Sequence, residues 1–161
     1  MSEQSDLRVV LGADHAGFEL KEEIKRFLEK QGYHPTDLGT NGREAVDYPD
    51  LALAVAEGVA KGQFDRGIMV CGTGIGSQVA ANKVPGVRAS VCHDTYSAKA
   101  SRLHNDLNVL CLGGRVIGPE LALEIVSAWL ATEFSGEERH LRRLAKIRQA
   151  ESTACRRPAA R

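Results

Sequence analysis

One cysteine of this chain stands between an apolar run and a glycine-rich turn. Ile68–Val70 leads into Cys71, and the turn that follows consists of Gly72, Thr73, Gly74, Ile75 and Gly76. Alternate glycines let main-chain N–H groups approach an anionic oxygen, and the start of the next helix adds partial positive charge. The same charge favours a thiolate, so the spacing indicates a base or nucleophile beside an oxyanion site. A buried structural cysteine above a tight turn explains this segment alone equally well.

Two further polar clusters follow segments that are predicted to be strands. Asp14 and His15 lie within Gly12–Gly17, and Arg115 follows Gly113 and Gly114. Open α/β sheets bind ligands where their parallel strands end, so these clusters are candidates for one site with Cys71. Taken singly, Asp14 is better explained as the cap of the following helix, and Arg115 as a surface charge.

Cationic residues near the C-terminus suggest a phosphate site. Arg139 and Arg143 are four residues apart and share one helix face, where they repel each other unless an anion or carboxylate lies between them. A solvated face is the usual explanation, but the glycine turn makes a phosphate clamp the sharper interpretation. His104 ends a predicted helix, where it either completes a cap or shuttles a proton.

Length and composition narrow the class of protein. The 161 residues fit one domain, and 21 Lys and Arg balance 21 Asp and Glu, so no net field favours nucleic acid or an anionic membrane. No apolar run approaches the roughly 20 residues of a membrane span, and the polar segment 1–8 lacks a signal-peptide core. The four cysteines show no zinc-site spacing, and no His, Asp or Glu set has metal-ligand spacing. We therefore expect a reduced, cytoplasmic protein without a metal.

Strand and helix patterns alternate along the chain. Strands are predicted at residues 7–12, 33–38, 66–71, 87–92 and 108–112. Helices are predicted at residues 18–31, 48–61, 75–83, 94–104 and 119–131. This alternation predicts a Rossmann-like three-layer α/β/α sandwich with a five-stranded, mostly parallel sheet.

The C-terminal part departs from this pattern. Residues 136–147 form a charged helical segment whose only apolar stripe is Leu141, Leu144 and Ile147. Such a helix cannot anchor itself in a core, so we expect it to extend toward a partner subunit or to lie over a site. Residues 151–161 lack a pattern and are expected to be a disordered tail after a domain at 7–150.

The glycine turn also approaches a dinucleotide-binding fingerprint. Ser77 occupies the position at which the pattern GxGxxG, counted from Gly72, needs its last glycine, and the turn follows the third predicted strand rather than the first. Asp94 does lie about 20 residues on, as that fingerprint asks, so NAD binding stays open on pattern alone. Cys71 directly before the glycines favours chemistry that the protein performs itself.

Six motifs in order resemble the B-type ribose-5-phosphate isomerases, in the family that includes galactose-6-phosphate and allose-6-phosphate isomerases. The resemblance covers about residues 7 to 150. The motifs are GADHAG at 12–17, DYP at 47–49, CGTGIG at 71–76, AANK at 80–83, RLHND at 102–106 and RHLRR at 139–143.

The resemblance implies interconversion of ribose 5-phosphate and ribulose 5-phosphate through an enediolate, a step of the non-oxidative pentose phosphate pathway. It implies no metal or organic cofactor, and a homodimer or dimer of dimers with sites at the subunit interface. A nucleotide-binding or sugar-phosphate-sensing module on the same fold is the second hypothesis, and loss of turnover with intact binding on removal of the thiol would separate the two.

Site residues follow from the same resemblance. Cys71 matches the base that moves a proton between the first two sugar carbons; Ser77 occupies the position where another branch carries a glutamate base. His104 matches the acid that opens the furanose ring, and the Thr73 hydroxyl belongs with these catalytic groups. The implied ligands of the sugar oxygens and the enediolate are Asp14, His15, Gly72, Thr73, Gly74, Ile75, Gly76 and Asn105. The implied phosphate ligands are Arg115, Arg139 and Arg143.

Overall fold

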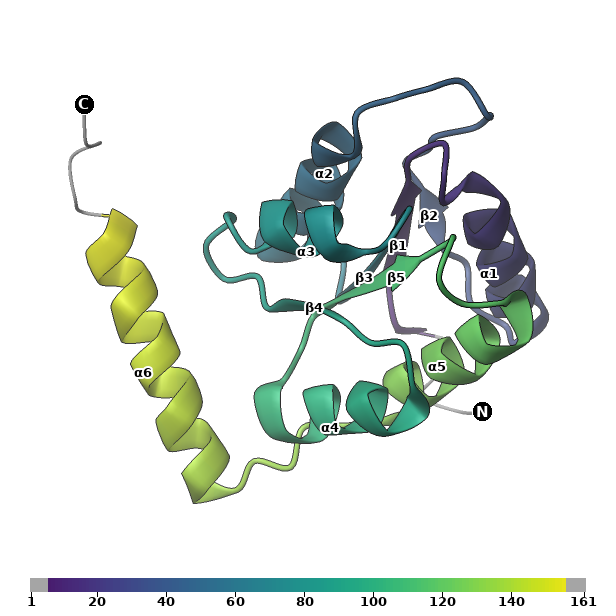
Figure 1. Ribbon diagram of the computed structural model, residues 1–161. Helices are drawn as coiled ribbons and strands as arrows, with labels where there is room; N and C mark the ends of the chain where they lie inside the picture. The colour runs from purple at the N-terminus through teal and green to yellow at the C-terminus, as the bar shows by residue number, and fades with distance from the viewer. Residues whose placement is uncertain (1–5, 156–161) are drawn as a thin grey trace, which may run out of the picture.

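Five short strands form one sheet in the order β2-β1-β3-β5-β4, and every pairing is parallel (Figure 1). The computed structural model describes residues 6–155. The strands are β1 (Val9–Ala13), β2 (Thr36–Asp37), β3 (Arg66–Cys71), β4 (Ala89–Val91) and β5 (Val109–Gly113). Parallel neighbours require crossover connections, and a helix lies in each of them.

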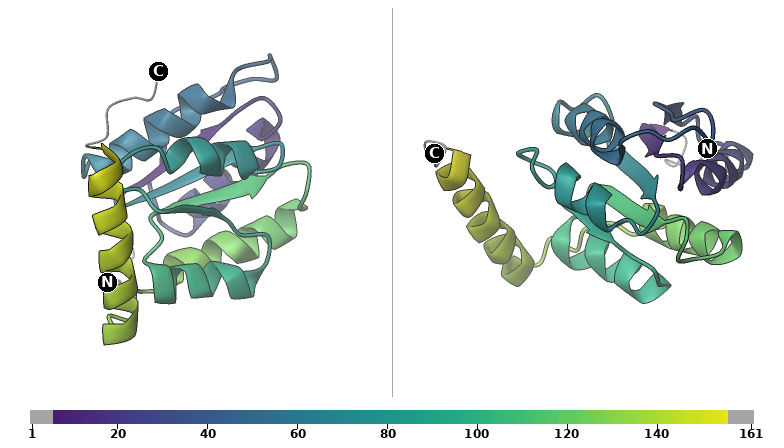
Figure 2. Two further views of the ribbon diagram at one scale, coloured as in Figure 1. Left: turned by 60° about the vertical axis from the view of Figure 1, so that its left-hand side comes forward. Right: turned by 45° about the horizontal axis from the view of Figure 1, so that its top comes forward.

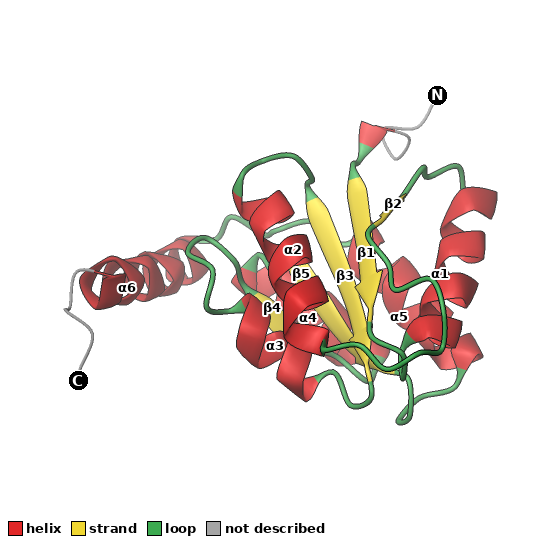
Figure 3. Cartoon of the chain, turned by 90° about the horizontal axis from the view of Figure 1, so that it is seen from above, coloured by secondary structure: helices red, strands yellow, loops and turns green. Residues whose placement is uncertain are grey.

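Helices cover both faces of the sheet (Figure 3). They are α1 (Phe18–Lys30), α2 (Tyr48–Ala60), α3 (Ile75–Ala81), α4 (Thr95–Asn105), α5 (Pro119–Ala131) and α6 (Glu138–Cys155). Buried side chains of α1, α4 and α5 share one core cluster, and those of α2 and α3 share the other. The strands are apolar toward both clusters, as a sheet covered on both faces requires. The predicted five-stranded α/β/α sandwich is confirmed, with a fully parallel sheet.

The two outer strands are shorter than predicted. Strand β2 has two residues, and β4 has three. Side chains from α3 and its C-cap satisfy the outer side of β4. Asn82 accepts from the N–H of Ala89 at 2.9 Å and donates to its carbonyl at 2.8 Å, while Gln78 accepts from the N–H of Val91 at 2.6 Å. Two amides therefore stand where another strand would pair.

Helix α6 stands away from the rest of the molecule (Figure 2). His140 and Leu144 are its buried residues, whereas Leu141 and Ile147 of the predicted apolar stripe are exposed. The helix runs to Cys155, because no glycine or proline interrupts residues 148–155. The expectation of a disordered tail from residue 151 is therefore wrong as far as Cys155, and residues 156–161 lie outside the described part of the chain.

Candidate active site

The turns after β3 and β5 are joined at the carboxyl end of the sheet, the side on which the strands finish. The N–H of Gly114 donates to the carbonyl of Cys71 at 2.8 Å, and the N–H of Arg115 donates to the carbonyl of Gly72 at 3.0 Å. The sequence predicted that these clusters share one end of the sheet, and the structure brings them into direct contact.

The turn after β1 fits against the other two without space for a side chain. A Cβ atom at Gly17 would lie 2.2 Å from the carbonyl oxygen of Val70, and one at Gly114 would lie 2.6 Å from that of Ala16. Only glycine allows main chains to approach so closely. The three predicted clusters therefore form one packed unit.

Cys71 lies at the floor of this unit. It is 4 % exposed, and its Sγ accepts the N–H of Gly74 at 3.2 Å. Gly74 begins α3 with φ of +79°, a conformation that glycine adopts without strain. An N–H aimed at sulfur stabilises negative charge there, as a thiolate base requires. Burial raises the pKa of the two neighbouring buried thiols, Cys92 and Cys111, which keeps them protonated.

Asp14 and His15 occupy the turn after β1. The Asp14 carboxylate accepts the N–H groups of Ala16 and Gly17 at 3.0 Å each, which closes the turn before α1. The N-cap of α1 is Gly17, without a side-chain cap bond, so the interpretation of Asp14 as the helix cap is wrong. His15 Nδ1 accepts the N–H of Val46 at 3.2 Å. The neutral ring therefore carries its proton on Nε2, where it can donate to a ligand.

Arg115 and Thr73 line the mouth of the glycine turn. A Cβ atom built at Gly72 would lie 3.6 Å from Nη1 of Arg115, so the guanidinium extends over the turn. Thr73 is exposed, and its hydroxyl accepts the N–H of Ile75 at 3.3 Å. A cation, a hydroxyl and a helix start thus all lie at the glycine turn, a combination that suits a phosphorylated ligand.

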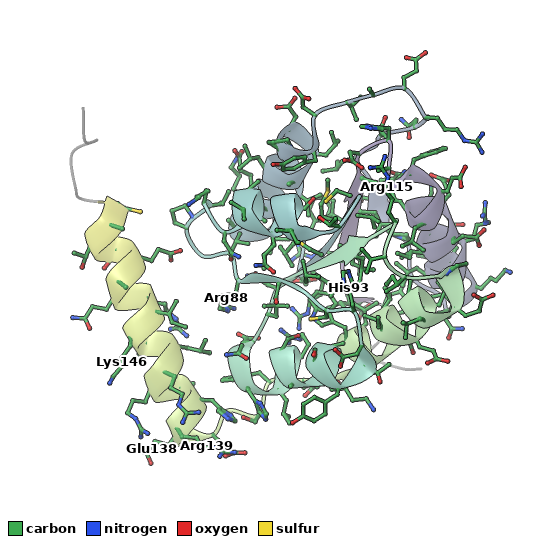
Figure 4. The ribbon with its side chains drawn as sticks, viewed as in Figure 1. Arg88, His93, Arg115, Glu138, Arg139 and Lys146 are labelled. Atoms are coloured by element: carbon green, nitrogen blue, oxygen red, sulfur yellow. The ribbon has the colours of Figure 1, made fainter. Side chains whose placement is uncertain are left out.

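Two residues without a role in the sequence interpretation belong to this neighbourhood. A Cβ atom at Gly76 would lie 2.5 Å from the Tyr48 ring, so Tyr48 covers the glycine turn. His93 follows β4, and its Nε2 accepts the N–H of Gly113 at 3.1 Å (Figure 4). Burial lowers the pKa of His93, which favours the neutral ring that this bond needs. The rule that polar groups gather where strands end could have found His93.

The remaining predicted residues lie elsewhere. Helix α4 runs back toward the amino end of the sheet, and its C-cap Asp106 accepts from the Arg88 guanidinium at 3.1 Å, directly before β4. His104 and Asn105 end the same helix. At about 3.3 Å per residue, the six residues of β3 place the two ends of the sheet more than about 15 Å apart. One chain therefore does not bring His104 and Asn105 to Cys71.

The arginines of α6 lie near His104 and not near Cys71. His140 of α6 touches His104, with ring centroids 4.7 Å apart. Arg139 and Arg143 flank His140 and are exposed, and Arg139 Nε donates to Glu137 at 2.8 Å. Arg115 and Arg139 lie at opposite sides of the molecule (Figure 4). The predicted phosphate ligands thus divide between two groups.

Two properties of the described residues bear on other functions. Among residues 6–155, no three His, Cys, Asp or Glu side chains gather closely enough to hold a metal ion. In the same part of the chain, no helix is both long and apolar enough to cross a membrane.

Comparison with known proteins identifies the family. The family model described as Ribose/Galactose Isomerase matches residues 9–147. The chain belongs to this family. Its membership in the Ribose/Galactose Isomerase family confirms the resemblance found from the six motifs and favours isomerase chemistry over a dinucleotide site.

Individual members of the Ribose/Galactose Isomerase family match closely. Ribose-5-phosphate isomerase B of Escherichia coli is 49% identical over 140 residues, which cover 87% of this chain and 93% of that protein. D-erythrulose-4-phosphate isomerase of Pectobacterium atrosepticum is 48% identical over 132 residues, 81% of this chain and 86% of that protein. The structure of Clostridium thermocellum ribose-5-phosphate isomerase B superposes with a TM-score of 0.90 at 53% identity, covering 92% of this chain and 99% of that one.

Proposed function

We propose that this protein interconverts ribose 5-phosphate and ribulose 5-phosphate by proton transfer through an enediolate. The observation that carries the proposal is Cys71, buried at the carboxyl end of the sheet with the N–H of Gly74 on its sulfur. Family members named ribose-5-phosphate isomerase B support the choice of substrate. Because a phosphorylated sugar does not cross a membrane unaided, this activity belongs in the cytoplasm.

Cys71 is the proposed base. Its thiolate removes the proton from C2 of the open-chain aldose, and the resulting thiol returns a proton to C1, while the hydroxyl proton moves from O2 to O1. The intermediate enediolate places negative charge on oxygen, so donors must face it. The main-chain N–H groups of the Gly72–Gly76 turn, within which α3 begins, supply donors and partial positive charge. One such donor is typically worth about 3 kcal/mol in the transition state.

His104 is the proposed acid that protonates the ring oxygen and opens the furanose. Since His104 and Cys71 lie at opposite ends of the sheet in one chain, the complete site requires a second copy. Exposed apolar residues support a homodimer. Leu141 and Ile147 on α6 are 46% and 53% exposed, and Ile75 and Val79 on α3 are 60% and 54% exposed.

The second copy also supplies phosphate ligands in this proposal. Arg115, beside the glycine turn, comes from one subunit. Arg139 and Arg143 come from α6 of the second copy, and the α4 of that same copy supplies His104 and Asn105. Guanidinium groups bind phosphate through paired charge-assisted hydrogen bonds, so arginines from two directions can enclose the dianion. Asp14 and His15 then hold the sugar oxygens.

The direct test is turnover of ribose 5-phosphate by the purified protein, followed by formation of ribulose 5-phosphate, with Cys71→Ala as the matched inactive variant. Binding of ribose 5-phosphate without turnover would favour a sensing module instead. Because one relative is named for a four-carbon substrate, D-erythrulose 4-phosphate belongs in the same assay. A higher kcat/KM for that sugar would move the proposed substrate to the four-carbon class.

Subunit mixing tests the composite site. Cys71→Ala and His104→Gln proteins should each have lost most turnover of ribose 5-phosphate, but a mixed dimer contains one site with both lesions and one with neither. Random exchange makes half of the dimers mixed, so about a quarter of wild-type activity should return. Absence of recovery despite demonstrated exchange, for example by mass spectrometry of differently tagged subunits, would rule out sharing of the site between subunits.

A further inference from the structure

We propose that His140 is a positioning residue for ring opening, because its imidazole holds the ring of His104 in the orientation that reaches the substrate. The proposal rests on the role of His104 as the acid that opens the furanose. It gives a function to a residue that lies between Arg139 and Arg143 in the sequence but is buried where they are exposed.

His140 is directed inward on α6. It is 3% exposed, whereas Arg139 and Arg143 on either side of it are exposed. Its ring lies 4.7 Å from that of His104 between centroids, at an interplanar angle of 38°. Tilted ring contacts at this distance favour one relative orientation of the two rings.

A closed set of contacts fixes the His140 ring relative to the helix that carries His104. The Ser135 hydroxyl lies 2.7 Å from Nδ1 of His140, and the N–H of Ser135 donates to the carbonyl of Leu103 at 3.0 Å. Leu103 directly precedes His104 in the chain. The ring that supports His104 is therefore anchored to the adjacent peptide and cannot turn without breaking the Ser135 bond.

Charge is consistent with this arrangement. Burial lowers the pKa of His140, and Arg139, His104 and Arg143 lower it further, while only Glu137 opposes them. His140 is therefore neutral near pH 7, so a protonated His104 meets an uncharged ring. Two adjacent imidazolium groups would repel each other and separate.

Anchoring of α6 is the alternative role, and Leu144 provides the matched control. Leu144 is 2% exposed and lies one helical turn beyond His140 on the same face. Removing either side chain loosens the attachment of α6. Only the loss of His140 also removes the support of the His104 ring.

The experiment compares a substrate whose furanose ring must open before isomerisation with a substrate that cannot form a furanose ring. Ribose 5-phosphate is mostly a furanose, whereas D-erythrose 4-phosphate has its phosphate on the oxygen that would close a five-membered ring. His140→Ala should lower kcat/KM for ribose 5-phosphate by about 10- to 100-fold, the cost of a misplaced catalytic group, and change that for D-erythrose 4-phosphate by no more than about threefold. His140→Phe, which keeps a ring against His104 but loses the bond to Ser135, should recover part of the difference.

Leu144→Ala should affect both substrates alike, through weaker phosphate binding. If the enzyme does not turn over the four-carbon sugar, uptake of deuterium from solvent at C1 of ribulose 5-phosphate replaces it, because that exchange needs no ring opening. A His140→Ala loss that is equal for both reactions would overturn the proposal. If His104→Gln itself shows no difference between the two substrates, the assignment of His104 as the acid fails instead.

Discussion

The main-chain N–H of Arg115 donates to the carbonyl oxygen of Gly72 across 3.0 Å, so the guanidinium extends from backbone that is tied to the glycine turn. The side chain itself is exposed, while its point of attachment is fixed. A fixed backbone and an exposed guanidinium suit a residue that binds an anion.

Arg115→Ala should therefore raise KM for ribose 5-phosphate about tenfold or more and change kcat much less. One charge-assisted contact to a phosphate dianion contributes about 1.5–3 kcal/mol. Steady-state kinetics and calorimetric binding of inorganic phosphate measure the effect. Arg115→Lys keeps the charge without the planar guanidinium, so its KM should lie between those of the wild type and the alanine variant. An unchanged KM in the alanine variant would remove Arg115 from the phosphate site.

Cys71→Ala should abolish isomerisation and leave substrate affinity within a few fold, because a base acts in the transition state and contributes little to ground-state binding. Alkylation offers a second measurement. Cys155 is the exposed thiol, so a Cys155→Ser background leaves the three buried thiols. In that background iodoacetamide should inactivate the enzyme, and substrate should protect it. Substantial turnover by Cys71→Ala would place the base elsewhere.

Gly17→Ala should destabilise the protein by about 3 kcal/mol or more, because its Cβ would lie 2.2 Å from the carbonyl oxygen of Val70, a backbone atom that cannot move alone. Gly42→Ala is the control, since nothing lies within 4 Å of a Cβ there. Its free energy of unfolding should change by less than about 0.5 kcal/mol. Urea denaturation measures the free energy of unfolding of both variants. Equal losses in the two variants would mean that the turn after β1 can shift without cost.

Lys21→Met should cost about 3–5 kcal/mol, because it leaves the Asp37 carboxylate without its buried partner. Lys21 is 1% exposed and its Nζ lies 2.6 Å from Asp37, whereas Lys25 reaches the same carboxylate at 3.1 Å from a side chain that is 30% exposed. Lys25→Met should cost less than about 1 kcal/mol. The double variant Lys21→Met, Asp37→Leu should recover much of the loss, which thermal denaturation can measure.

Acid should destabilise the protein partly through His93. Burial lowers the pKa of His93 below its ordinary value of 6.5, so the unfolded chain binds a proton that the folded chain does not. The stability that His93 contributes is complete above about pH 6.5 and is lost as the pH falls below it. His93→Gln keeps an acceptor for the N–H of Gly113 and removes the titration. Its Tm should fall less than that of the wild type between about pH 7.5 and about pH 5, and identical slopes would contradict the assignment.

The carboxyl-end rule was the strongest guide from sequence to site. It placed Asp14, Cys71 and Arg115 together because each follows a segment that is recognisable as a parallel strand. The alternation of strands and helices also determines where His104 lies. A helix after the strand at 87–92 must run back, so His104 at its end had to lie at the opposite end of the sheet from Cys71.

Other features depended on contacts that no local pattern contains. Tyr48 covers Gly76, which is distant in sequence, and this contact follows from how α2 packs against α3. Arginine is usually a surface residue, yet Arg102 is 2% exposed and donates to the Leu107 carbonyl and the Asp106 carboxylate. That part of the RLHND motif supports the end of α4 rather than a ligand. The extension of α6 to Cys155 was missed because its charged residues have no apolar period.

The amides of Asn82 and Gln78 decide how copies of this protein can associate. An outer strand with free N–H and C=O groups is a template on which sheets of separate molecules join and aggregate. Here the outward groups of Ala89 and the outward N–H of Val91 are already bonded to side chains. Growth of a continuous intermolecular sheet is blocked on this side, which directs association toward helix surfaces, where a discrete assembly can form and stop.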